Sequence, residues 1–130
     1  MPHYSGLSLY YQEQILEALP TLYMALDTTE GDANDANYVE VTTSGTGYVR
    51  REVELTSYSG GSVTNNADIL FPVATASYGT VVALRLMDSI TVGAGNCIAR
   101  CPCDSTAIAE NDRFEVLASG LDINLARTIT

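Results

Sequence analysis

The stretch Asn65–Asp88, NNADILFPVATASYGTVVALRLMD, decides the fold class of this sequence. It holds two apolar runs, 69–73 and 81–87, with a Tyr-Gly turn between them. β-branched and aromatic residues favour strands and glycine interrupts them, so the pattern predicts a strand, a turn and a strand as the central pair of an antiparallel sheet. Because Pro72 has no backbone N–H, the first strand must lie at an edge, end there or bulge. The second run leaves Arg85 on the side opposite its apolar stripe, where it must reach solvent or a carboxylate.

Short alternating segments surround this pair and recur at a spacing of roughly ten residues. Turns rich in Gly, Asn and Asp separate them. The turn with Gly45 and Gly47 predicts a hairpin and not a dinucleotide site, because no helix follows it. The segments predicted as strands are 21–27, 38–43, 48–55, 97–104, 113–118 and 121–125, the last with Leu121, Ile123 and Leu125 on one face.

Residues 5–19 predict a helix that Ser5 or Ser8 caps and Pro20 ends. Gln12 is expected to face away from the apolar stripe, which is formed by Leu7, Tyr11, Ile15 and Ala18.

The whole pattern predicts a mainly β fold, an antiparallel β-sandwich or barrel of about eight short strands with one N-terminal helix. We expect a helical arm at 1–20, which covers a sheet or docks on a neighbouring subunit, and a β-sandwich domain at 21–130.

Composition narrows the class of protein. The 130 residues carry a net charge of −10, with six arginines and no lysine, and such a field repels phosphate, so direct nucleic-acid binding is not expected. No apolar run reaches the ~18 residues of a membrane span. The N-terminus lacks the basic cluster of a signal peptide, so we expect a protein that is made in a cytoplasm.

The sequence offers little for catalysis, which predicts a protein that is not an enzyme and carries no cofactor. His3 is the single histidine, and it lies too near the terminus for a catalytic triad. Glu52 and Glu54 share one strand face, but the nearby arginines are ready ion-pair partners for them.

Two groups of residues raise the question of a metal site. The acidic loop at 27–37 lacks the ligand spacing of an EF-hand, so a solvated hairpin loop is favoured over a calcium site. Cys97, Cys101 and Cys103 form C-x3-C-x-C, which is not zinc spacing and would need His3 or Asp104 as a further ligand. Small thiols facing the core are the favoured interpretation, and an inter-subunit disulfide is the alternative, because the count of cysteines is odd.

Several motifs, in order along nearly the whole chain, resemble those of small tailed-phage virion proteins known as tail-fibre or head-decoration proteins. They are Leu22–Thr29 (LYMALDTT), Ser44–Arg50 (SGTGYVR), Asn66–Pro72 (NADILFP), Ala74–Val81 (ATASYGTV), Ala109–Phe114 (AENDRF) and Leu121–Ile123 (LDI). The chain departs from that pattern at Tyr78, where Trp is expected, and at the cysteine-rich segment Cys97–Cys103.

The resemblance implies a structural virion protein on the outer surface of the particle. The favoured expectation is a capsid decoration (cement) protein, a homotrimer bound to the major capsid protein. The alternative is a tail-fibre or baseplate module bound to tail proteins, which takes part in host attachment. The candidate interface residues are Leu7, Tyr10, Tyr11, Ile15, Tyr48, Arg50, Arg51, Tyr58, Tyr78, Arg85, Cys97, Cys101 and Cys103.

Overall fold

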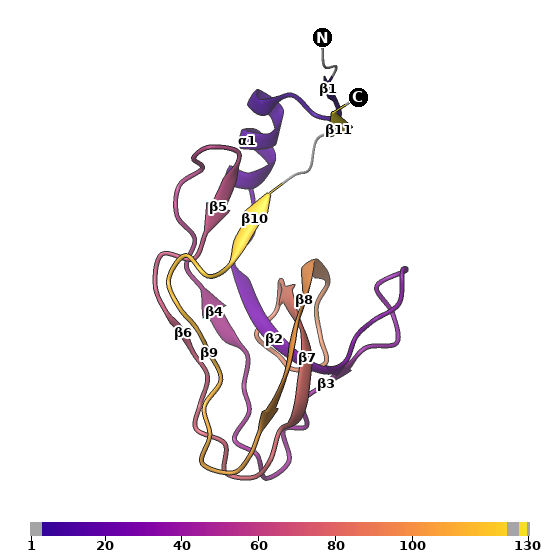
Figure 1. Cartoon of the computed structure of the whole chain (residues 1–130), viewed down its shortest axis with the longest axis vertical. Coiled ribbons are helices and arrows are strands. Elements are labelled where there is room, and N and C mark those ends of the chain that lie inside the picture. The colour runs from indigo at the N-terminus through magenta and orange to yellow at the C-terminus, as the bar shows by residue number, and fades with distance from the viewer. Residues whose placement is uncertain (1–3, 125–127, 130) are drawn as a thin grey trace.

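The computed structural model describes residues 4–124 and 128–129, so the predictions for His3 and Leu125 lie outside the described residues. It confirms the mainly β class: one helix and several antiparallel sheets, with no closed barrel among the described residues (Figure 1). The helix α1 spans Leu9–Glu17. The strands are β1 Tyr4–Ser5, β2 Leu22–Thr29, β3 Val39–Glu40, β4 Arg51–Val53, β5 Ser62–Thr64, β6 Ile69–Leu70, β7 Gly79–Met87, β8 Cys97–Ile108, β9 Glu115–Val116, β10 Asp122–Asn124 and β11 Thr128–Ile129.

The largest sheet has five strands and is organised around β7, which pairs antiparallel with β2 on one side and β8 on the other. The prediction of a central strand here is therefore confirmed. Two short strands, β3 and β4, share the other edge of β2: Glu40 lies opposite Asp27, and Val53 lies opposite Leu22. Both faces of β7 are buried from Val81 to Met87, apart from the half-buried Val82.

The first apolar run does not pair with β7 as predicted, and that part of the prediction is wrong. It forms β6, which pairs with β9, with Ile69 opposite Val116. The backbone contact continues past the strand, where the Phe71 N–H donates to the Phe114 carbonyl at 3.1 Å. In Figure 1, β6 and β9 run side by side next to β4, at the edge of the large sheet. Regular pairing ends at Leu70, before the proline that cannot take part in it.

Aromatic side chains fill the core between the large sheet and these outer segments. Tyr48 stacks on Phe71 with ring centroids 6.2 Å apart, and Tyr78 meets the edge of Tyr48 at 5.7 Å. All three are buried, together with Leu22, Met24 and Leu26 of β2 and the apolar stripe of β7. Offset and edge-on aromatic pairs add to the stabilisation that burial itself supplies.

The helix is shorter than the predicted 5–19: it begins after Ser8, the second of the two predicted caps, and it buries a different face. Ser8 is the N-cap, and its Oγ accepts a hydrogen bond from the Tyr11 N–H at 3.2 Å. Gln12 and Leu16 are the buried residues, whereas Leu7 and Tyr11 of the predicted stripe are exposed. Gln12 is satisfied there because its Nε2 donates to the Leu7 carbonyl at 3.0 Å. At nine residues, α1 is also too short to cross a membrane, and the described residues contain no helix that is long and apolar enough to do so.

Strand β8 forms an edge of the large sheet and contains two irregularities, near Ile98 and just after Pro102. They change which side chains share a face. Cys97 lies opposite Met87 and Cys101 lies opposite Leu84, and because Met87 and Leu84 point to opposite faces of β7, so do these two cysteines. The favoured interpretation, in which all three thiols face the core, is therefore wrong for the three together.

Candidate functional site

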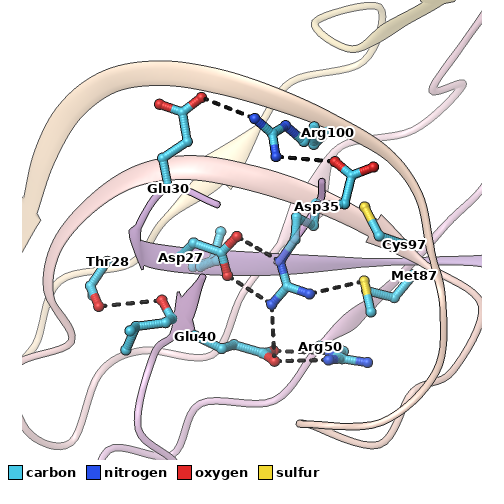
Figure 2. A network of polar contacts seen from close by, with 12 residues as sticks. Asp27, Thr28, Glu30, Asp35, Glu40, Arg50, Met87, Cys97 and Arg100 are labelled. Atoms are coloured by element: carbon cyan, nitrogen blue, oxygen red, sulfur yellow. Dashed lines mark hydrogen bonds and ion pairs between the residues drawn. The ribbon is translucent and has the colours of Figure 1, made fainter. Parts of the chain in front are cut away.

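A network of buried charged groups lies beside β2, where the edge strand β3 meets it (Figure 2). Arg85 on β7 donates two hydrogen bonds to Asp27 on β2, with Nε–Oδ2 at 2.6 Å and Nη2–Oδ1 at 2.8 Å. Arg50 donates two hydrogen bonds to Glu40 on β3 in the same bidentate manner, with Nε–Oε2 at 2.9 Å and Nη2–Oε1 at 2.8 Å. The two pairs touch, since Arg85 Nη2 is 3.5 Å from Glu40 Oε1. Two carboxylates and two guanidinium groups thus neutralise one another.

Uncharged groups complete the network. The Tyr48 hydroxyl donates to Glu40 Oε2 at 2.5 Å and accepts from the Leu26 N–H at 3.0 Å. Arg50 Nη1 donates to two carbonyls of the β7–β8 loop, those of Ser89 and Ala94, at 2.8 Å each. Hence the network ties the 41–50 segment and the β7–β8 loop to the middle of the sheet.

Burial and hydrogen bonding oppose each other in setting the acidity of these groups. Burial alone would raise the pKa of Glu40, but hydrogen bonds from Arg50 and Tyr48 outweigh burial and leave this pKa below its ordinary value of 4.5. Burial, with a smaller contribution from the Glu40 charge, raises the pKa of Asp27, while the contact with Arg85 acts in the opposite direction. Burial and the hydrogen bond to Glu40 both raise the pKa of the Tyr48 phenol. The network holds these charged side chains in fixed positions and buries their proton-donating groups away from solvent.

The acidic loop is fastened by an arginine. Arg100 on β8 reaches the carboxylate of Asp35 at 3.0 Å and that of Glu30 at 4.0 Å. Asp32 caps its own loop by accepting from the N–H groups of Asn34 and Ala36. Within the described residues, no three His, Cys, Asp or Glu side chains gather as a metal site requires. The structure thus gives these carboxylates protein partners.

Exposed apolar side chains gather at the N-terminal end of α1. We call Leu7, Leu9, Tyr10 and Tyr11 the N-terminal knob; they are between 42% and 71% exposed. A surface hollow of about 450 Å³ beside the knob is lined by Leu9, Tyr10 and Glu13 from α1 and by Tyr58 and its glycine turn. The Tyr58 N–H donates to Glu17 at 2.7 Å, which holds this turn against the helix.

The opposite flank of α1 borders a second hollow, which we call the α1–β8 groove. Its volume is about 280 Å³, and every residue that lines it is apolar. Its walls include Ile15, Leu16 and Leu19 from the helical side, Ile98 and Ala99 from β8, and Ile123 from β10.

The predicted interface residues divide into two groups. Four of them, Tyr48, Arg50, Tyr78 and Arg85, are buried inside the chain, which removes them as surface contacts. Their aromatic rings and charges serve the core, as described above. For the others an interface role stays a prediction: Leu7, Tyr10 and Tyr11 in the knob, Ile15 in the groove, and Arg51 and Tyr58 on the surface.

The three cysteines are free thiols within this chain. Cys101 is exposed, so the prediction of a core position is wrong for it, whereas Cys97 and Cys103 are half-buried. Their pairing between subunits stays a prediction.

The sequence did not reveal two residues of these sites, one in the buried network and one in the knob. Glu40 joins both arginines, yet nothing in its short strand marks it. Leu9 is the first residue of α1 and part of the knob, and its place outside the predicted stripe was a signal that it faces outward.

Comparison with known proteins places the chain in a family. No curated protein and no solved structure matched it. The family model described as podophage GP4 fiber I protein gp80 matches residues 7–124. The match takes in α1, the large sheet, the buried network and β10. Because it covers nearly all of the 130 residues, the chain belongs to the podophage GP4 fiber I protein gp80 family and is a structural protein of a phage.

Proposed function

We propose that this protein is a non-enzymatic component of the phage tail fibre, carried on the outer surface of the particle. The observation that carries the proposal is the family match, whose description names a fibre protein and which extends over 7–124. On this proposal its partners are tail proteins.

The chemistry of the chain supports a structural role. The buried carboxylates of Asp27 and Glu40 are matched with arginines at 2.6–2.9 Å. An acid–base catalyst needs instead a titrating group within reach of a substrate. Four of the exposed large apolar side chains, those of the knob, lie close together in sequence at the start of α1, and exposed apolar surface of this kind is typical of contacts between proteins.

Capsid decoration, the favoured expectation from sequence, is the competing placement, with the major capsid protein as partner. It is supported by the resemblance to head-decoration proteins, whereas the family description favours the fibre. In both proposals a compact acidic domain binds an assembled structure, so the position of the protein on the particle is what distinguishes the two.

Gold-labelled antibody against this protein, applied to intact particles and viewed by electron microscopy, tests the proposal. Gold confined to the tail or to fibres is the expected result. Gold spread over the head would contradict the fibre role and favour decoration. Particles that lack the protein serve as the control for non-specific labelling.

A further inference from the structure

A short strap of chain crosses one face of the large sheet. We call residues 30–38 the strap; they lie between β2 and β3 and form most of the acidic loop. Arg85 on β7 and Arg100 on β8 lie directly opposite each other in the sheet, so their side chains share a face, and both contact the strap. Figure 2 shows Glu30 and Asp35 of the strap directed at the guanidinium of Arg100.

The strap is folded on itself. The Asp32 N–H donates to the Ala36 carbonyl at 2.8 Å. The Asp32 carboxylate accepts from the Asn34 N–H at 2.9 Å and from the Asn37 side chain at 2.7 Å. These contacts lie within the strap, so they persist when it leaves the sheet, and the strap can move as one piece.

Arg100 fastens the strap to the sheet. Its Nη1 donates to the Asp32 carbonyl and to Asp35 Oδ1, the second bond at 3.0 Å, and its Nη2 lies 4.0 Å from Glu30 Oε1. Within the described residues, every hydrogen bond and ion pair that joins the strap to the sheet comes from Arg100. Gly31 permits this closeness, since a Cβ there would lie 3.2 Å from Arg100 Nη1.

Little free energy opposes the release of the strap. None of its residues is buried, and Tyr38, its one aromatic residue, is half-buried with the ring centroid 3.4 Å from Arg85 Cζ. The Arg100 side chain is 30% exposed, and an ion pair that solvent reaches contributes little and is weakened by salt. Segments with few buried apolar contacts open locally while the rest of a protein stays folded.

The two opposing arginines depend on the strap unequally. Arg85 has its own counter-ion in the sheet, because it donates two hydrogen bonds to Asp27. Arg100 has its carboxylates on the strap. Opening therefore leaves the buried network paired and removes the counter-ions of Arg100 alone.

The closed strap leaves almost no space beneath it. The hollow there has a volume of about 10 Å³, and its lining includes Tyr38, Arg85, Cys97 and Arg100. One water molecule needs about 10–15 Å³ by this measure, so no larger molecule fits while the strap is closed.

We propose that the strap acts as a lid, which opens as one piece when the contacts of Arg100 break, while the sheet stays folded. The open strap uncovers Arg85, Arg100 and Cys97. It thereby controls access to the thiol of Cys97, whose pairing between subunits stays a prediction. The opening does not depend on where the protein lies on the particle, so its test and that of the fibre role fail separately.

The rate at which Cys97 reacts with N-ethylmaleimide, a small uncharged thiol reagent, tests the strap. In the parent protein Cys101 and Cys103 are replaced by serine, which leaves Cys97 as the one thiol. Arg100→Gln should make the reaction about five-fold faster, because the loss of an exposed ion pair shifts an equilibrium by up to about that factor. The matched control is Arg113→Gln, which removes an exposed arginine outside the strap and should leave the rate unchanged.

Two further measurements separate access from charge. Burial raises the pKa of the Cys97 thiol and the charge of Arg100 lowers it, so the loss of Arg100 would by itself slow the reaction. Gly31→Ala changes no charge, and its Cβ would lie 3.1 Å from the Ala36 oxygen and 3.2 Å from Arg100 Nη1, so it should loosen the strap and speed the reaction. Sodium chloride should speed the reaction of the parent but not that of Arg100→Gln, which has no ion pair left to screen.

Slow exchange of the amide hydrogens of β7 verifies in each protein that the sheet is folded. Equal rates in the parent and Arg100→Gln would overturn the proposal, as would a gain of the same size in Arg113→Gln. A faster reaction together with loss of slow exchange in β7 would contradict it too, because the whole sheet would then open. A parent whose rate does not respond to salt would overturn it without any variant.

Discussion

At the scale of single residues, Glu40 is the carboxylate of the buried network that contacts both arginines. It accepts from Arg50 and Tyr48 and lies 3.5 Å from Arg85. Glu40→Gln leaves the guanidinium of Arg50, whose side chain is fully buried, without its counter-ion. Breaking a buried pair from one side costs about 3–5 kcal/mol, and we expect a loss of that size in the free energy of unfolding, measured in urea. The control is Glu30→Gln, which breaks an exposed 4.0 Å pair and should cost about 0–1 kcal/mol.

The same residue predicts how stability depends on pH. The pKa of Glu40 in the folded protein is lower than the ordinary 4.5, so its contribution is fully present above about pH 4.5 and is lost as the pH falls through the folded value. The stability difference between wild type and Glu40→Gln should therefore be constant near neutral pH and shrink below pH 4.5. Burial, the largest cause of the raised pKa of Asp27, is common to both proteins, whereas the smaller upward effect of the Glu40 charge on that pKa is lost in the variant. An unchanged difference far below that pH would contradict the assignment.

At this scale the sequence correctly predicted a contact when the need for a partner followed from a single residue. Arg85 in an apolar strand needs a carboxylate or solvent, and it has the carboxylate of Asp27. The identity of that partner, 58 positions away, depends on the pairing of β2 with β7 and could not be derived from composition. For the same reason the sequence predicts Arg50 as an interface residue, whereas its counter-ion Glu40, on a different strand, holds it in the interior.

At the scale of elements, α1 is stabilised by the face it buries against the sheets and not by its intrinsic propensity, because a nine-residue helix is marginal in water. Leu16→Ala, at a side chain that is 4% exposed, should lower the free energy of unfolding by about 2–5 kcal/mol, which thermal or urea unfolding measures. Gln14→Ala, at an exposed position of the same helix, should change it by less than about 0.5 kcal/mol. Both are compared at one protein concentration, because association stabilises the native state. Equal effects of the two substitutions would contradict the observed orientation of α1.

The elements also show why the rest of the fold could not be predicted. Two possible stripes of α1 are offset by one residue, and the structure buries the one with Gln12 and Leu16, where the Gln12 amide donates to the Leu7 carbonyl. Strand composition marks β6 and β7 as strands, but it does not say that β6 pairs with β9. The irregularities of β8 reverse the face of its cysteines, and alternation alone presumes a regular strand.

At the scale of the whole molecule, charge governs how copies meet. The net charge of −10 acts over about 30 Å at 0.01 M salt and over about 8 Å at 0.15 M. A contact between copies through the uncharged knob would have no attractive charge pair for salt to weaken, so screening would remove only repulsion between copies. The trimer predicted from the resemblance is one ring that such a contact permits, and its copy number stays a prediction.

We therefore expect that the predicted homotrimer, if its copies meet through the uncharged knob, becomes several-fold tighter as sodium chloride rises from about 0.01 to 0.15 M, a range over which the screening length falls by roughly a factor of four. The measurement is the concentration at which the assembly dissociates, followed by light scattering at each salt concentration. Leu9→Gln with Tyr10→Gln, which makes the exposed knob polar, is the comparison, and it should remain at 13.9 kDa throughout. Weakening by salt would mean that copies are held by opposite charges, such as those of Arg51 or Arg113 against an acidic loop. The knob would then not be the surface that joins them.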